Sequence, residues 1–211
     1  MRARRVIALV AALLLLPVVA PPAWAGPPTD QLRAQVDGAL RTLENPELRK
    51  DATERRAAIR KIANDIFDFT ETTKRSLGRH WHGRTPAERE QIVQLFGDLL
   101  ERAYIGKIEL YGGEKIGYVG EAIEGEQATV RTRLVTKGGT EIPIDYRMHR
   151  RGDRWLTYDV SIEGVSLVAN YRTQFNKIIQ GGSYQELVRK LEAKLAEPPE
   201  EPEPRKQASR K

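Results

Sequence analysis

The segment from Lys115 to Glu163 constrains the fold most, because apolar and polar residues alternate along it in four successive runs. Alternation with a period of two is typical of strands that bury only one face of a sheet. Glycines near Gly125, at Gly138-Gly139 and at Gly152 separate the runs and suit tight turns. The sequence therefore predicts four antiparallel strands that share one apolar face.

Each predicted strand carries one apolar row of side chains and one polar row. The apolar rows are Ile116, Tyr118 and Ala122; Ala128, Val130, Thr132 and Leu134; Ile142, Ile144, Tyr146 and Met148; and Leu156, Tyr158, Val160 and Ile162. An apolar sheet face in water must be covered by another layer of structure, which predicts helices packed on it.

Apolar residues at helical spacing precede the strands. They predict helices around residues 32–43, 58–67 and 69–77, followed by a long helix over 85–111. The long helix has the clearest start, because the Thr85 hydroxyl and the Glu88 carboxylate can form a capping box there.

The spacing becomes helical again after Glu163-Gly164, from Val165 to Ile179, and a second capping box at Ser183 and Glu186 begins the last helix. Because helices and strands are segregated along the chain, the pattern indicates an α+β fold. We expect a curved antiparallel sheet of about four strands, covered by N-terminal and C-terminal helices and enclosing an apolar cavity.

The N-terminus has the features of a signal peptide. Three arginines precede the apolar run Val6–Ala20, and Ala23-Trp24-Ala25 suits cleavage. The run has about 15 residues, fewer than the roughly 20 that a membrane-spanning helix needs. We expect residues 1–25 to be removed, 26–195 to form one α+β domain, and the proline- and charge-rich residues 196–211 to be a disordered tail.

Composition excludes several classes of protein. The chain has no cysteine, which rules out disulfides and thiolate metal sites. Its net charge of +6 falls to +3 once Arg2, Arg4 and Arg5 leave with the signal peptide. So small an excess over a whole domain predicts no nucleic-acid partner. An exported chain without cysteine suits the bacterial periplasm.

Two candidate chemical sites are weak. His80, His82 and His149 are too few and too irregularly spaced for a typical zinc site, so we expect packed, hydrogen-bonded histidines and no metal. The segment Gly164–Val168 resembles a nucleophile elbow around Ser166, but Val168 replaces the second glycine and no histidine follows. A helix N-cap is the favoured role for Ser166.

Paired carboxylates are the remaining catalytic candidate. Glu141 and Asp145 share one strand face, as do Asp159 and Glu163, but nearby arginines such as Arg147 favour structural ion pairs. We expect no enzyme activity, no catalytic residues and no cofactor. Aromatic and aliphatic residues are abundant at regular spacing, and this pattern leaves open whether they fill a core or line a ligand cavity.

Several motifs together resemble the MlaC family, also called toluene-tolerance auxiliary proteins, over roughly residues 30–195. In chain order they are Leu77-Gly78-Arg79-His80-Trp81, the Thr85-Pro86 helix ending in Ala103-Tyr104, Ile142-Pro143-Ile144-Asp145-Tyr146-Arg147, Trp155 with Tyr158-Asp159-Val160, and Ile162-Glu163-Gly164-Val165-Ser166-Leu167-Val168 with Asn170-Tyr171-Arg172. An ordered series of this kind is far more specific than one short motif.

The resemblance implies a periplasmic phospholipid carrier that buries acyl chains in an apolar cavity and moves lipid between the inner and outer membranes. It also implies two partners: an inner-membrane ABC transporter with a substrate-binding ring protein, and an outer-membrane lipoprotein complex. Two alternatives stay open: a non-catalytic exported adaptor with a solid core, and a carrier of another lipid such as a hopanoid.

On this hypothesis the lipid-binding residues come from the long helix, the strands and the segment after Gly164. They are Phe96, Leu99, Leu100, Tyr104 and Ile108 on one wall, Tyr118, Val130, Ile144, Tyr146, Met148, Tyr158 and Val160 on the other, and Val165 and Val168 at one end. Arg147 and Arg172 are candidates for positive charge near the headgroup. The alternative for these arginines is an ion pair with Asp145 or Asp159.

Overall fold

The computed structural model describes residues 27–48, 50–109 and 112–198; the predicted signal peptide and most of the predicted tail lie outside this part. It is an α+β fold, as predicted, with helices on both sides of the strands in chain order. The elements are α1 (Pro27–Glu44), α2 (Ala52–Ile66), α3 (Phe69–Leu77), the 3₁₀ turn η1 (Gly78–Trp81), α4 (Pro86–Glu109), β1 (Lys115–Glu124), β2 (Gln127–Val135), β3 (Glu141–Arg151), β4 (Arg154–Ile162), β5 (Val165–Ser166), α5 (Leu167–Gly181) and α6 (Tyr184–Ala196).

The strands form one antiparallel sheet in the order β1-β2-β3-β4-β5, so each strand pairs with its neighbour in the chain. The predicted turns are confirmed: Gly125, Gly139 and Gly152 all have positive φ between paired strands. Such backbone angles suit glycine, because a side chain clashes there.

A short fifth strand lies where the helical spacing was expected to begin. Ile162 pairs with Val165 across a two-residue loop, in which Glu163 (φ 51°) and Gly164 (φ 81°) both have positive φ. Positive φ at both loop positions is the requirement of a tight hairpin turn. The chain therefore makes one more strand pairing before α5 begins at Leu167.

The predicted helix starts are confirmed by hydrogen bonds. Thr85 N–H donates to Glu88 Oε2 at 2.9 Å, and Glu88 N–H donates to Thr85 Oγ1 at 3.2 Å. Ser166 Oγ accepts from Ala169 N–H at 3.0 Å, the N-cap role predicted for it. Each cap satisfies backbone donors that the first turn of a helix leaves unpaired.

Two bulges break the predicted apolar rows. Tyr118 pairs with Thr132 but Gly120 pairs with Arg131, which leaves Val119 opposite no residue. On β4, Thr157 pairs with Met148 and Asp159 with Arg147, so Tyr158 is the extra residue. Each bulge moves the following side chains to the other face of the sheet.

The row expected along β4 is accordingly corrected. Leu156 pairs with His149, on one face, whereas Val160 pairs with Tyr146 and Ile162 with Ile144, on the other. We call the face that carries Tyr146 and Ile144 the inner face, and the opposite one the outer face.

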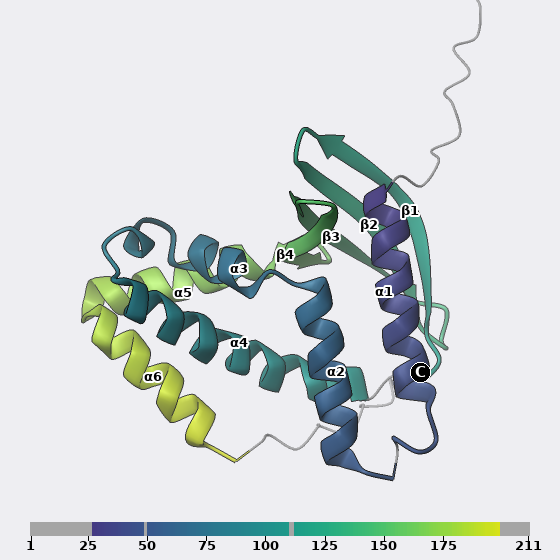
Figure 1. The fold of residues 1–211 in the computed structure, drawn as a ribbon, viewed down its shortest axis with the longest axis horizontal. Helices are drawn as coiled ribbons and strands as arrows, with labels where there is room; N and C mark the ends of the chain where they lie inside the picture. Colours follow the sequence, from purple (N-terminus) through teal and green to yellow (C-terminus); the bar gives the residue numbers. More distant parts are fainter. Residues whose placement is uncertain (1–26, 49, 110–111, 199–211) are drawn as a thin grey trace, which may run out of the picture.

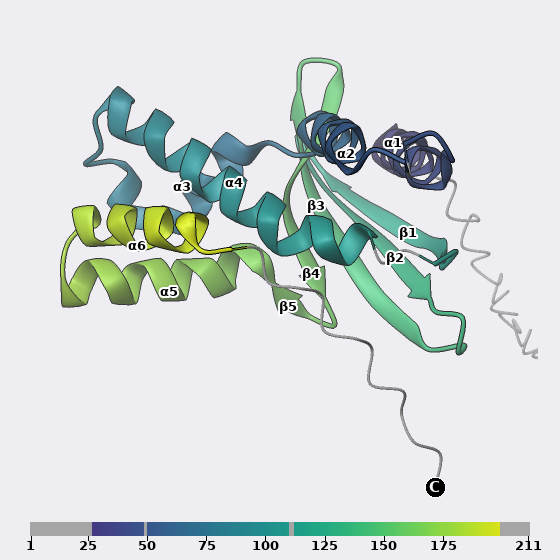
Figure 2. The ribbon, with the colours of Figure 1, turned by 90° about the horizontal axis from the view of Figure 1, so that it is seen from below.

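The buried apolar residues form two main clusters rather than one. The helical half, made of α3, η1 and α4 to α6, contains the cluster Leu77, Trp81, Ile92, Phe96, Leu100, Phe175, Tyr184, Leu187, Val188 and Leu191. The sheet half, made of α1, α2 and the strands, contains Leu32, Val36, Ile66, Ala128, Val130, Met148 and Trp155. Figures 1 and 2 show the two halves side by side, with α4 reaching from one toward α2 in the other.

Polar contacts join the two halves. Buried Asp159 on β4 accepts from Ser166 Oγ at 2.7 Å and from Val168 N–H at 3.0 Å, and thereby fixes the start of α5. The Arg60 guanidinium of α2 forms an ion pair with Glu101 of α4, with N to O distances of 2.5 Å. These hydrogen bonds and this ion pair fix how the two halves meet.

Candidate functional site

The inner face of the sheet is apolar along its length but covered only in part. Val130 on β2 and Met148 on β3 are fully buried, since they belong to the sheet cluster under α1. Farther along β3, Tyr146 and Ile144 are half-buried, and Ile162 beside them on β4 is 40% exposed. The apolar side chains of β3 and β4 are therefore more exposed toward the β2–β3 turn than at Met148.

The partly covered region draws on four strands, and we call it the open inner face. Its residues are Ile116, Tyr118, Leu134, Ile142, Ile144, Tyr146, Val160 and Ile162. A cluster of large apolar side chains that stay partly exposed is typical of a binding surface, because it loses contact with water only when another molecule covers it.

Helix α1 closes one end of this face. Thr29 donates to Glu121 Oε2 on β1 through both N–H and Oγ1–H, at 3.1 and 2.6 Å. Gln31 forms a pair of hydrogen bonds with the backbone of Trp155 on β4, at 2.5 and 2.9 Å. These contacts hold α1 across the strands and set where the covered end stops.

Two tyrosines on the open inner face lie in a poorly solvated environment. Burial raises the pKa of the Tyr146 hydroxyl to about 12. Burial also raises the pKa of Tyr118, with smaller contributions from Asp37 and from the neighbouring Tyr146. Both hydroxyls therefore stay protonated at neutral pH and act as hydrogen-bond donors on an otherwise apolar face.

The structure places the candidate residues of α4 in different settings. Phe96 and Leu100 are buried within the helical half, where Phe96 packs edge-on against Phe175 with ring centroids 5.0 Å apart. Leu99 and Tyr104 are partly buried at the margin of that cluster. The side chain of Ile108 lies outside the described residues.

The remaining apolar candidate residues also lie in different parts of the molecule. Tyr158 lies on the outer face, where the Arg75 guanidinium stacks on its ring at 3.9 Å. Val168 is buried at the start of α5, whereas Val165 on β5 is 64% exposed. The assignment of these residues to a ligand site stays a prediction.

Both candidate headgroup arginines contact the protein. Arg147 lies on the outer face and forms an ion pair with Asp159 at 3.3 Å, one of the two partners that the sequence offered. Arg172 Nε donates to the backbone oxygen of Arg75 at 2.8 Å. Neither contact is on the inner face, and their role near a headgroup stays a prediction.

Two of the three histidines, His80 and His149, have side-chain partners in the protein, and His82 is exposed. His149 Nε2 lies 3.1 Å from Asp68 Oδ2, and His80 Nε2 lies 3.0 Å from Asn176 Oδ1. Within residues 27–48, 50–109 and 112–198 no group of three potential metal ligands converges.

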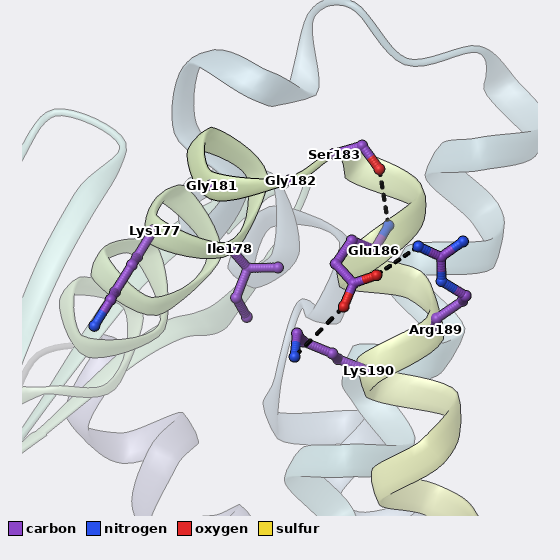
Figure 3. A pocket seen from close by; sticks show the side chains of 8 residues that line it. All are labelled: Lys177, Ile178, Gly181, Gly182, Ser183, Glu186, Arg189 and Lys190. Carbon is purple, nitrogen blue, oxygen red and sulfur yellow. Dashed lines mark hydrogen bonds and ion pairs between the residues drawn. The ribbon is translucent and has the colours of Figure 1, made fainter.

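A separate hollow lies at the turn between α5 and α6, with a volume of about 550 Å³. Figure 3 shows Lys177, Arg189 and Lys190 around it, and Glu186 paired with the last two. Four of its eight lining residues are charged, and all eight belong to α5, α6 and the turn between them, so it is distinct from the open inner face.

Fold and face together define a class: an α+β domain whose single antiparallel sheet presents an apolar face that its own helices leave partly uncovered. The model of the family described as MlaC protein matches residues 33–193, and the chain belongs to this family. The resemblance found in the sequence is thereby confirmed.

The known proteins that are similar to it include the following two. One is the intermembrane phospholipid transport system binding protein MlaC of Haemophilus influenzae, 21% identical over 145 residues, which cover 65% of this chain and 68% of that protein. The other is a phospholipid-binding protein from Ralstonia solanacearum, solved in complex with a phospholipid. It has a TM-score of 0.71 and 28% identity, and the match covers 81% of this chain and 99% of that chain.

Among the helices of the described part, none has the length and apolarity needed to cross a bilayer.

Proposed function

We propose that this protein binds a phospholipid with its acyl chains on the open inner face and carries it between membranes. The observation that carries the proposal is the apolar row on β3, which continues from buried Met148 to half-buried Tyr146 and Ile144. Membership of the MlaC family and the phospholipid complex of the Ralstonia solanacearum relative support the same ligand.

The energetics of lipid transfer require such a face. Burying one methylene group contributes about 0.8 kcal/mol, so two acyl chains with about 30 methylenes represent roughly 24 kcal/mol gross. A carrier must offset most of this cost in water and still release the lipid. A partly covered wall such as Ile144, Tyr146 and Val160 suits both demands, because it gains cover from the ligand.

The setting follows from the same proposal. The protein acts in the periplasm as the auxiliary component of an ABC transport system. It receives or delivers lipid at an inner-membrane transporter with a substrate-binding ring protein and at an outer-membrane lipoprotein complex. Its role is binding and transport rather than catalysis. The name of the Haemophilus influenzae relative, a binding protein of an intermembrane phospholipid transport system, supports these partners.

Organic extraction of the protein purified from cells, followed by mass spectrometry, tests the proposal. We expect about one phospholipid per protein molecule. A hopanoid or another lipid in equal amount would change the cargo but keep the carrier. Protein that is folded and free of lipid would instead favour the adaptor with a solid core.

A matched pair of variants locates the site. Ile144→Glu places a charge on the open inner face, and we expect lipid content to fall at least severalfold while circular dichroism stays native. Val119→Glu is the control, because Val119 is 51% exposed at the β1 bulge and outside the open inner face. Equal loss of lipid in both variants would argue against the open inner face as the site.

A further inference from the structure

We propose that Arg33 on α1 and Tyr118 on β1 hold the polar end of the bound lipid, through its acceptor oxygens, at the β1 side of the open inner face, next to α1. This inference rests on the proposed function and adds an orientation to it. Tyr118 is level with Thr132 on β2 and Ile144 on β3, so the acyl chains then extend across the sheet toward Ile144 and Tyr146, away from α1.

Arg33 is the first observation. Its guanidinium carbon lies 4.6 Å from the centroid of the Tyr118 ring, and the side chain is exposed on α1. Within the described residues it has no acidic partner at ion-pair distance. Arg147 and Arg172 differ in this respect, since both are engaged by protein oxygens. A planar guanidinium that keeps its donors available is well suited to a phosphate.

The Tyr118 hydroxyl is the second, independent observation. Its oxygen is buried and has no hydrogen-bond partner among the described residues. A buried hydroxyl without a partner is unfavourable, and native proteins rarely keep one without a function. An ester or phosphate oxygen of a lipid would supply the missing acceptor, because the hydroxyl is protonated and can donate.

Three polar side chains lie near the Tyr118 hydroxyl: Asp37, Arg33 and Tyr146. Asp37, one turn farther along α1, lies close enough to raise the pKa of Tyr118, and Arg33 lowers it. The nearby Tyr146 hydroxyl is a second possible donor. The Asp37 carboxylate balances the charge of the Arg33 guanidinium, and the two tyrosine hydroxyls add hydrogen-bond donors. The surroundings of the Tyr118 hydroxyl are therefore neutral in net charge and rich in donors, which favours acceptor oxygens over a cationic group.

The experiment compares lipid-free and lipid-loaded protein. Tyr118→Phe and Arg33→Gln are each loaded with phosphatidylglycerol, with its diether analogue, which lacks ester carbonyls, and with diacylglycerol, which lacks phosphate. Tyr184→Phe is the matched control for the phenol: its hydroxyl donates to Glu88 O at 2.9 Å in the helical half. Arg41→Gln is the control for the arginine, since Arg41 is exposed in the last turn of α1.

For Tyr118→Phe we expect lipid-free thermal stability that is unchanged or higher, and phosphatidylglycerol retention about fivefold lower, as for one lost hydrogen bond. A loss that persists with the diether lipid assigns the acceptor to phosphate, and a loss confined to ester lipids assigns it to a carbonyl. For Arg33→Gln we expect retention about tenfold lower for phosphatidylglycerol and unchanged for diacylglycerol.

The proposal is overturned if both variants retain phosphatidylglycerol as the wild type does, or if the two control variants lose it equally. In that case the wild-type protein still carries lipid, and the proposed function stands. If the wild-type protein itself binds none of the three lipids, the proposed function fails and this inference fails with it.

Discussion

The two halves of the molecule use apolar residues in opposite ways. In the helical half, aromatic rings interlock: Phe96 packs against Tyr171 and Phe175 with centroids 4.8 and 5.0 Å apart. In the sheet half, the apolar row passes beyond the buried cluster and stays partly exposed at Ile144 and Ile162. The first arrangement stabilises the protein alone, whereas the second gains stability when a ligand covers it.

The largest expected effect is in the helical half. Phe96→Ala removes a fully buried ring, and we expect the free energy of unfolding to fall by about 3–5 kcal/mol. Urea unfolding of the lipid-free protein measures it, with Val165→Ala at an exposed position as the control. A loss below about 1 kcal/mol would mean that the helical half is as incompletely packed as the open inner face.

The junction comes next. Asp159→Asn weakens the hydrogen bonds to Ser166 and Val168 and removes the ion pair with Arg147. We expect a loss of about 2 kcal/mol, because the carboxylate is buried and charge-assisted bonds are strong. Urea unfolding of this variant is followed by both fluorescence and circular dichroism. One shared midpoint would show that the two halves still unfold together, whereas two separate midpoints would show that Asp159 is needed to couple their unfolding.

The pH dependence of the sheet half has a definite sign. Burial raises the pKa of Tyr146 from 10.0 to about 12, so the folded state keeps a proton that the unfolded state releases. Its contribution to stability is complete below about pH 10 and is lost as the pH rises toward 12. We expect Tyr146→Phe to flatten the alkaline fall of stability, measured by urea unfolding at several pH values. If stability falls with rising pH as steeply in Tyr146→Phe as in the wild type, the Tyr146 hydroxyl is in contact with water in the folded protein and its pKa is not raised by burial.

The smallest expected effect is at the exposed bridge between α2 and α4. A double-mutant cycle with Arg60→Gln and Glu101→Gln should give a coupling energy of about 0.2–1 kcal/mol, because the Arg60 side chain is largely exposed. The raised pKa of Arg60, due first to its hydrogen bond with Glu101, agrees with this pairing in direction. Urea unfolding of the four proteins measures the coupling. A coupling energy above about 2 kcal/mol would contradict this expectation and show that the ion pair contributes strongly to holding the two halves together.

Local patterns predicted the elements well. The Thr85 capping box, the N-cap role of Ser166 and the glycine turns depend on residues close together in the chain, and all are present. The bulges at Val119 and Tyr158 were not predicted, because a period of two residues assumes that every residue of a strand pairs regularly with its neighbour. One extra residue reverses every later side chain, which is why Tyr158 and Val160 lie on opposite faces.

The candidate site was less predictable for a related reason. The stripe on α4 is wide, and the sequence alone does not distinguish buried Phe96 from partly buried Leu99. Arg33 was missed because nothing near it in the chain marks it; its relation to Tyr118 arises only when α1 packs on β1. A long-range pairing of this kind has no local pattern.

The bulge at Val119 has a consequence for solubility. Strand β1 is one edge of the sheet, opposite the two-residue strand β5, and carries two exposed aliphatic side chains, Val119 and Ile123. A regular edge of that kind invites strands from other molecules to join, but the extra residue puts its donors and acceptors out of step halfway along. The bulge thereby disfavours edge-to-edge association of β1 with other copies of a protein that must keep an apolar face available for its ligand.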